Sequence, residues 1–109
     1  MITEVRYSNK AKGQLKKYKR TRKIPDYALE KLRVWRDTVK NFGIAHAQNV
    51  HKFHDHSLKG DWKGHRSIYL DMTTWRAIYR IVKTKEKGKD KIEVLIEYVE
   101  VVEVNPHEY

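Results

Sequence analysis

Apolar residues recur with helical spacing over the stretch that runs from Pro25 to Gly43. At intervals of four and three residues stand Ala28, Leu32, Trp35, Val39 and Phe42. This spacing places them on one face of an amphipathic helix. Proline favours the first helical turn, and glycine favours the left-handed conformation that ends a helix, so these two residues mark the boundaries of the predicted helix.

The segment before it predicts a short strand and a second, more basic helix. Apolar positions alternate over residues 2–8, as they do in a strand. Ser8 or Asn9 then supplies an N-cap for a helix over about residues 9–22, because apolar side chains lie four and three residues apart on one face. These side chains are Ala11, Leu15 and Tyr18.

After a predicted loop that ends near residue 64, the apolar period changes from 3.6 to 2. Three runs rich in Ile, Val, Tyr and Trp follow, as expected of strands: residues 65–71, 75–83 and 91–104. A charged turn around Gly88 separates the last two runs, and a change of parity in the last run predicts a β-bulge. We therefore predict one α+β domain over residues 1–109, in which an N-terminal strand and a helical hairpin pack on an antiparallel β-sheet in two layers.

The composition indicates a polyanionic partner. The chain has 24 lysines and arginines against 14 acidic residues, a net charge of +10, and a domain of this size displays such a charge on its surface. The predicted basic helix concentrates it, with six cations among the eight residues 16–23. There is no cysteine, and no apolar run approaches the roughly 20 residues of a membrane span. We expect a cytoplasmic protein without disulfides or membrane contact.

Residues 51–66 read HKFHDHSLKGDWKGHR and combine histidines, basic residues and glycines. His51, His54 and His56 are possible metal ligands, but their spacing puts only two of the three on one face of either a strand or a helix. We therefore expect no metal here. A polar loop whose histidines have no role is an alternative interpretation.

The same run is consistent with an RNA-binding loop. Lys59, Lys63 and Arg66 surround two glycines, whose backbone amides approach a phosphate closely. Trp62 and Trp75 offer flat rings for base stacking, which contributes about 1–3 kcal/mol per base, although burial is the stronger expectation for Trp75 on an apolar strand. Basic groups, tight turns and aromatic rings together favour single-stranded RNA.

The string D-H-S-L-K-G-D-W-K-G-H-R, followed by Trp75 and by I-Y-R-I, resembles the D-H-P-L-x-G-x-W-x-G-x-R…W…I-Y-x-I signature of the RelE/ParE superfamily of bacterial toxins, and most closely its YafQ-like branch. The motif covers residues 55–81, and the order of predicted elements matches the superfamily across essentially the whole chain. The resemblance implies a toxin of a type II toxin–antitoxin system. Such a toxin is an endoribonuclease without metal or cofactor that cuts mRNA in the ribosomal A site and is neutralised by a cognate antitoxin.

In YafQ-like toxins the catalytic residues occupy four positions that can be located in this sequence. Two of them keep the family's histidine, at His56 and His107. The other two differ, because Tyr69 stands in place of a histidine and Thr74 in place of an aspartate. Ser57 also replaces the proline of the motif. The resemblance makes the two histidines the general base and the general acid of RNA cleavage, in either order.

Further candidates follow from the needs of this reaction. A tyrosine supplies a second proton-transfer group, as it does in RelE-like members, and arginines stabilise the charge that develops on the phosphate. The candidate catalytic residues are His56, His107, Arg66, Tyr69, Arg80 and Tyr109. The candidate contacts to mRNA and ribosomal RNA are Lys16, Lys17, Lys19, Arg20, Arg22, Lys23, Lys59, Trp62 and Lys63.

Two alternatives remain beside the ribosome-dependent nuclease. A ParE-like toxin inhibits DNA gyrase by protein contact and hydrolyses nothing. A catalytically impaired relative binds RNA without cutting it, and the two departures from the family's catalytic set are consistent with such a relative. The resemblance also implies a cognate antitoxin, for which an exposed sheet edge or a groove beside the helices is suited.

Overall fold

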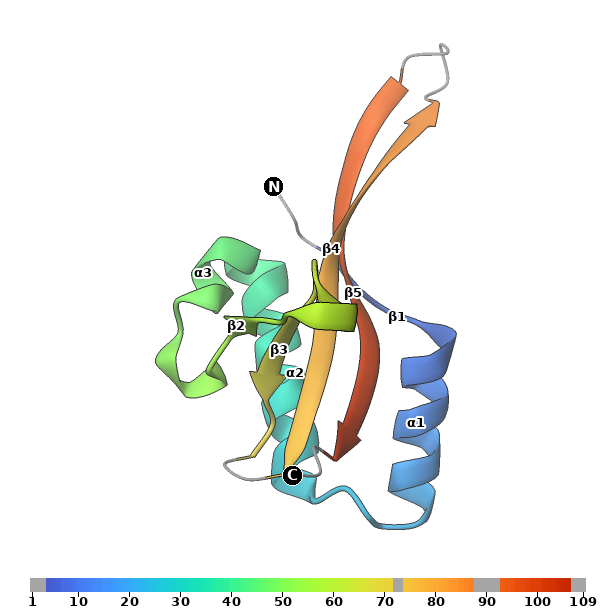
Figure 1. Ribbon diagram of the computed structural model, residues 1–109, viewed down its shortest axis with the longest axis vertical. Coiled ribbons are helices and arrows are strands. Elements are labelled where there is room, and N and C mark those ends of the chain that lie inside the picture. The colour runs from blue at the N-terminus through green and yellow to red at the C-terminus, as the bar shows by residue number, and fades with distance from the viewer. Residues whose placement is uncertain (1–3, 72–73, 88–92, 107–109) are drawn as a thin grey trace.

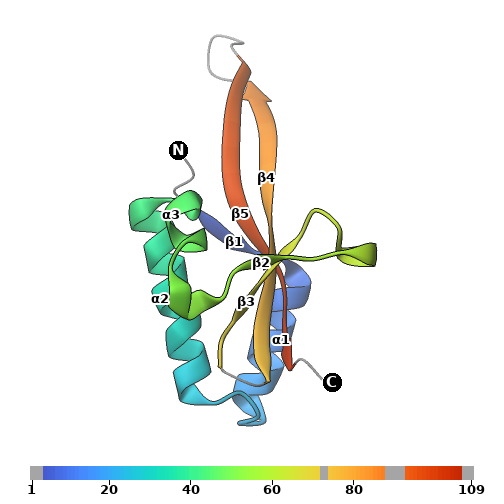
Figure 2. The same cartoon turned by 60° about the vertical axis from the view of Figure 1, so that its left-hand side comes forward.

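The computed structural model describes residues 4–71, 74–87 and 93–106, and in it helices pack on a five-stranded sheet (Figures 1 and 2). The strands are β1 (Val5–Tyr7), β2 (His56–Ser57), β3 (Arg66–Tyr69), β4 (Trp75–Lys87) and β5 (Glu93–Pro106). The helices are α1 (Asn9–Arg20), α2 (Asp26–Phe42) and α3 (Ile44–Gln48), with short 3-10 helices η1 (His51–Phe53) and η2 (Gly60–Trp62).

The sheet joins strands from both ends of the chain. Its order is β1-β5-β4-β3-β2, with β1 parallel to β5 and every other described pairing antiparallel. This arrangement confirms the predicted α+β class, with an N-terminal strand and a helical hairpin on a mainly antiparallel sheet. None of the described helices is long and apolar enough to cross a membrane.

Both predicted helices are present, with nearly the predicted ends. Ser8 caps α1, because its hydroxyl accepts a hydrogen bond of 3.0 Å from the Ala11 backbone N–H. Gly43 ends α2 with a φ of +87°, a conformation that costs glycine little. Phe42, the last residue of the predicted apolar row, is 66% exposed and contacts the ring of His46, so the buried stripe of α2 ends at Val39.

The core lies between the helices and one face of the sheet. Alternate residues of the strands face the helices and are buried there: Ile68, Trp75, Ala77, Tyr79, Val99, Val101 and Val104. Trp35 of α2 packs on Tyr79 with ring centroids 5.2 Å apart, and Tyr18 of α1 meets the edge of Trp75 at 5.0 Å. Full burial of a large apolar side chain contributes roughly 1.5–3 kcal/mol, so this face of the sheet holds the two layers together.

Strand β5 contains the predicted bulge. Tyr79 pairs with Val101 and Ile78 pairs with Glu103, so Val102 has no partner on β4. An extra residue in one strand reverses the faces of all residues that follow it. The valines on both sides of the bulge are consequently buried against the helices.

The outer edge of β5 is covered by two elements in succession. β1 pairs with residues 99–101. Beyond β1, the Ser8 hydroxyl donates to the Val102 carbonyl at 2.9 Å, and the Val104 backbone N–H donates to Gln14 Oε1 at 2.8 Å. Side chains of α1 and its cap therefore satisfy backbone groups that an edge strand otherwise leaves open.

The structure corrects the predicted loop between Gly43 and residue 64. This segment contains α3, η1, β2 and η2, each of which spans at most five residues. A periodic pattern needs a longer window before it separates from chance, so elements this short left no signal in the sequence. β4 also runs to Lys87 rather than residue 83, and the β4–β5 ribbon extends beyond the other strands (Figure 1).

Ser8→Ala removes both the cap of α1 and the hydrogen bond to β5. We expect the free energy of unfolding, measured by urea denaturation, to fall by about 1–2 kcal/mol. Thr21→Ala is the matched control, because the Thr21 hydroxyl bonds only an exposed carbonyl within α1, that of Lys17, and its loss should stay below about 0.5 kcal/mol. Equal losses in the two variants would contradict the double role of Ser8.

Candidate active site on the open face of the sheet

The chain between β2 and β3 arches over the open face, by which we mean the sheet face opposite the helices (Figure 2). Gly60 and Gly64 have φ angles of +67° and +88°, which other residues rarely adopt. The arch is closed where the Leu58 backbone N–H donates to the His65 carbonyl at 3.0 Å. As a result β2 returns antiparallel to β3 and holds His56 at the edge of the sheet.

On the open face, Tyr69 lies between two imidazoles. Its ring centroid is 5.3 Å from that of His54, in a stacked contact, and 5.6 Å from that of His56, in an edge contact. His56 Nδ1 lies 2.9 Å from the His54 carbonyl oxygen. Because a carbonyl only accepts, Nδ1 is the donor, and Nε2 is the nitrogen available for proton exchange.

A row of polar residues crosses the open face at the level of Tyr69. The strand register places Arg76 beside Tyr69, and Asn105 beside Arg76, and residues paired in this way point to the same face. Arg76 Nε donates to Asn105 Oδ1 at 3.3 Å, and Asn105 Nδ2 donates to Glu103 Oε2 at 2.8 Å. Lys10 of α1 is ion-paired with Glu103. The row therefore places the guanidinium of Arg76 beside Tyr69.

Asp55 precedes His56 in sequence. Its side chain lies on the helix side of the sheet and takes part in a network of hydrogen bonds there. The carboxylate is fully buried; it accepts a hydrogen bond from Arg66 Nε at 2.6 Å and another from the Tyr79 hydroxyl. Gln48 of α3 donates to the same tyrosine oxygen at 3.3 Å. One buried carboxylate thus joins α3, β3 and β4 to the segment that leads into β2.

The protonation of this network follows from its contacts. Burial raises the pKa of Tyr79, and the hydrogen bond to the Asp55 carboxylate raises it further. Burial acts to lower the pKa of Arg66, but the hydrogen bond and the charge of Asp55 act against it, and the resulting pKa is raised. Near neutral pH Arg66 is therefore a cation and Tyr79 a neutral donor.

Neither a protein-family model nor a curated protein sequence matches the chain. Solved structures do match it. YafQ from E. coli superposes with a TM-score of 0.65 at 18% identity, over 95% of this chain and 92% of that one. A chain of the E. coli DinJ–YafQ toxin–antitoxin complex gives 0.63 at 20% identity, over 98% and 94%. A YoeB/ParE toxin from Agrobacterium tumefaciens gives 0.58 at 18% identity, over 96% and 99%. The chain has the RelE/ParE toxin fold.

Within the RelE/ParE fold, the two predicted arginines lie away from the row at Tyr69. Arg66 is paired with the buried carboxylate described above. Arg80 lies four residues farther along β4 than Arg76, about 13 Å at 3.3 Å per residue, and its Nη2 is 3.0 Å from a Glu100 oxygen. Both predicted cations are therefore engaged in ion pairs with carboxylates.

The predicted RNA-binding residues lie in two places on this fold. Lys59 and Lys63 are exposed on the arch, whereas Trp62 is half-buried with its ring edge-on to His65 at 5.2 Å. The six basic residues at the end of α1 and in the turn after it are all exposed: Lys16, Lys17, Lys19, Arg20, Arg22 and Lys23. Trp75 is 5% exposed, which confirms its predicted burial.

His107 and Tyr109 lie outside the described residues. The last described residue, Pro106, pairs with Trp75 at the start of β4. Thr74 is exposed and its backbone N–H donates to Asp71 Oδ1 at 2.6 Å. In the described ranges, no group of three or more His, Cys, Asp or Glu side chains is arranged to hold a metal.

Arg76 and Asn105 are absent from the sequence-based prediction. Arg76 stands between two buried residues of β4, Trp75 and Ala77, and this alternation alone assigns it to the open face. Its place beside Tyr69, however, depends on the register of β3 and β4. The sequence therefore contained the signal for its face but not for its neighbour.

Tyr79→Phe tests the buried phenol. An unfolded chain releases a tyrosine proton near a pKa of about 10, whereas the pKa of folded Tyr79 is higher. The stability that Tyr79 contributes is complete below about pH 10 and is lost as the pH rises toward the folded pKa, because the unfolded state gives up its proton first. We expect the free energy of unfolding, measured in urea from about pH 7 to about pH 11, to fall more steeply in the wild type than in the variant. Parallel curves would contradict the raised pKa.

Proposed function

We propose that the protein is the toxin of a toxin–antitoxin pair and acts on the ribosome as an mRNA endoribonuclease that requires no metal. The proposal rests on the placement of His56, Tyr69 and Arg76 together on the open face of a RelE/ParE fold. These residues supply an imidazole, a phenol and a guanidinium. Cleavage of RNA by its own 2′-hydroxyl needs a base, an acid and a cation around one phosphate.

The reaction begins with attack of a ribose 2′-oxygen on the adjacent phosphorus. His56 Nε2 takes the 2′-hydroxyl proton while the new P–O bond forms, and the bond from phosphorus to the 5′-oxygen of the next nucleotide breaks. A general acid gives that oxygen a proton. The products are a 2′,3′-cyclic phosphate and a free 5′-hydroxyl. Tyr69, His107 and Tyr109 are the candidates for the acid.

Arg76 is better suited than Arg66 or Arg80 to stabilise the charge on the phosphate. Arg66 and Arg80 each hold a carboxylate within the protein, at 2.6 Å and 3.0 Å. Within the described part of the chain Arg76 makes no ion pair, and its hydrogen bond is to a neutral side-chain amide. Its positive charge thus stays available for a charge-assisted bond to phosphate oxygens.

The basic end of α1 provides contacts to ribosomal RNA. Its six cations at residues 16–23 are exposed and form no ion pair with a described residue. Phosphate contacts from such residues give affinity that falls with salt and does not depend on sequence. Lys59 and Lys63, exposed on the arch, provide a second group of cations beside the open face.

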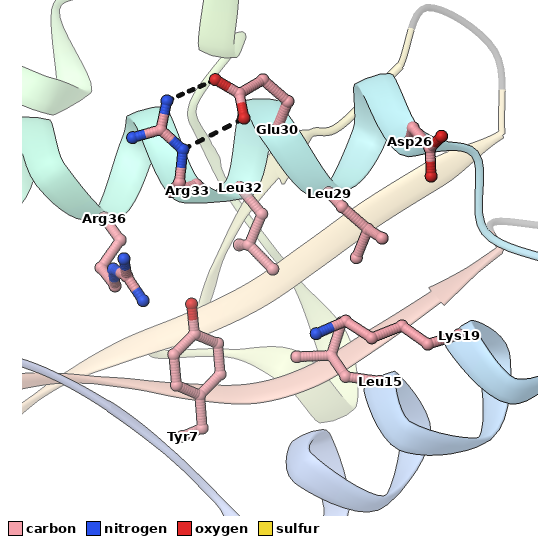
Figure 3. A pocket seen from close by; sticks show the side chains of 9 residues that line it. All are labelled: Tyr7, Leu15, Lys19, Asp26, Leu29, Glu30, Leu32, Arg33 and Arg36. Carbon is pink, nitrogen blue, oxygen red and sulfur yellow. Dashed lines mark hydrogen bonds and ion pairs between the residues drawn. The ribbon is translucent and has the colours of Figure 1, made fainter.

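A groove between α1 and α2 is the proposed seat of an antitoxin segment (Figure 3). It has a volume of about 380 Å³ and is lined by Tyr7, Leu15, Lys19, Asp26, Leu29, Glu30, Leu32, Arg33 and Arg36. In Figure 3 the tyrosine hydroxyl and the leucine side chains point into the space between the helices. Three cations and two carboxylates stand around its apolar floor, and one of these cations is ion-paired with a carboxylate of the same rim. An apolar floor and a rim with a small excess of positive charge fit an acidic amphipathic segment. A toxin–antitoxin complex among the similar structures supports an antitoxin partner.

We expect the purified protein to cleave a reporter message within its reading frame in a translating extract that contains a chelator. His56→Ala and Arg76→Ala should each lower the cleavage rate by on the order of 100-fold or more, because each removes a group that acts in the transition state. His46→Ala, at an exposed imidazole of α3, is the matched control and should cleave at the wild-type rate.

Each alternative predicts a different result in the same assay. A gyrase inhibitor leaves the message intact and alters DNA supercoiling, and an impaired RNA-binding relative does neither. Loss of cleavage on adding chelator would contradict metal independence. If Arg80→Ala reduced cleavage as much as Arg76→Ala, the assignment of the phosphate-binding cation to Arg76 would fail.

The antitoxin proposal is tested with Leu29→Glu, which places a carboxylate on the floor of the groove. The partner is the small acidic protein expected from the neighbouring reading frame. We expect its affinity, measured by calorimetry, to fall at least about tenfold, with RNA cleavage by the variant unchanged. Asn41→Glu, at an exposed position of α2 outside the groove, adds the same charge as a control. Equal affinities for the two variants would show that the antitoxin binds another surface, such as a sheet edge.

A further inference from the structure

The buried carboxylate of Asp55 has no direct access to a substrate. Its side chain has 0% exposure, and its hydrogen bonds come from Arg66 and Tyr79, on paired positions of β3 and β4. Tyr79 belongs to the core on the helix side of the sheet. A general acid or base must reach the proton it transfers, so Asp55 itself is excluded from that role.

Stability alone is a weak reason for such an arrangement. An apolar group of similar volume often replaces a buried ion pair at no cost or with a gain in stability. What an ion pair adds is direction, because its hydrogen bonds accept one geometry and reject others. The ion pair therefore matters through the neighbouring residues that its geometry holds in place.

The residues on either side of Asp55 make the contact that sets the chemistry of the site. His54 has a left-handed backbone with φ of +48°, and its carbonyl oxygen lies 2.9 Å from His56 Nδ1. Successive residues of an extended chain point to opposite faces. Because the Asp55 carboxylate is held on the helix side of the sheet, it fixes the His54 carbonyl and directs the His56 side chain to the open face.

We propose that Asp55, held by Arg66 and Tyr79, is a positioning residue that sets the orientation and the tautomer of His56. Through the fixed backbone it keeps the His54 carbonyl on Nδ1, which leaves Nε2 unprotonated in the neutral imidazole, and it keeps the ring in its edge contact with Tyr69. Arg66 is then a structural cation of the motif that acts through Asp55. The catalytic meaning of this inference rests on the proposed nuclease function.

The test measures the His56 tautomer by nitrogen-15 NMR of the imidazole rings, which requires no substrate. Tyr79→Phe removes one of the two donors to Asp55 with little change in volume, and Asp55→Asn removes the charge. We expect the wild type to carry its neutral proton on Nδ1, and both variants to gain the Nε2-protonated tautomer. Tyr98→Phe, at a half-buried tyrosine of β5, is the matched control and should leave the His56 nitrogen shifts unchanged.

Cleavage on programmed ribosomes is measured with the same proteins. The maximal rate should fall on the order of 100-fold in Tyr79→Phe, as expected when a reacting group is misplaced, while the protein concentration for half-maximal rate stays the same. His56 nitrogen shifts in Tyr79→Phe and Asp55→Asn that match the wild type would overturn the positioning role. If those shifts change as expected while the wild type cleaves no message, the nuclease proposal fails and the structural link from Asp55 to His56 stands.

Discussion

A carboxylate enclosed by protein keeps its charge only where cationic and hydrogen-bonding groups surround it. For Asp55 these groups are Arg66 and Tyr79, which stand opposite each other on β3 and β4. The ion pair therefore forms only when the two strands are in this register and the chain before β2 has reached its place. Removal of one partner of a buried pair costs on the order of 3–5 kcal/mol. One contact thus selects a single arrangement of loop and sheet.

Side chains alternate between the two faces of the sheet, so the arrangement that the Asp55 ion pair selects also fixes the open face. Trp75 is buried against the helices and Arg76 points the other way, just as Asp55 lies under the sheet and His56 above it. The bulge in β5 belongs to this scheme, because without it Glu103 would turn into the core. Alternation and one extra residue therefore separate an apolar face, which binds the helices, from a polar face, which carries the candidate chemistry.

The sequence predicted those parts of the molecule that depend on local rules. Periodic apolar positions and the residues at Ser8 and Gly43 located both long helices, and the motif named His56 and Tyr69 as candidate site residues. The neighbours across the sheet could not be obtained in this way, because a change of one residue in the turn between β3 and β4 would place a different side chain beside Tyr69. The motif makes Arg66 a candidate catalytic cation, but its buried carboxylate partner is a tertiary contact that no periodicity reports.

The departure of this chain from the YafQ-like pattern has a chemical consequence at Tyr69. A phenol carries a proton that it can donate, whereas a neutral imidazole offers a ring nitrogen that accepts one. A tyrosine in place of a histidine therefore suits the acid better than the base. In the proposed reaction the base is then His56, whose Nδ1 donates to a carbonyl and whose Nε2 is available. Arg76 lies in the same row as Tyr69 and supplies the cation. The tyrosine in place of a histidine is therefore compatible with the proposed nuclease, with His56 as the base and Tyr69 as the acid.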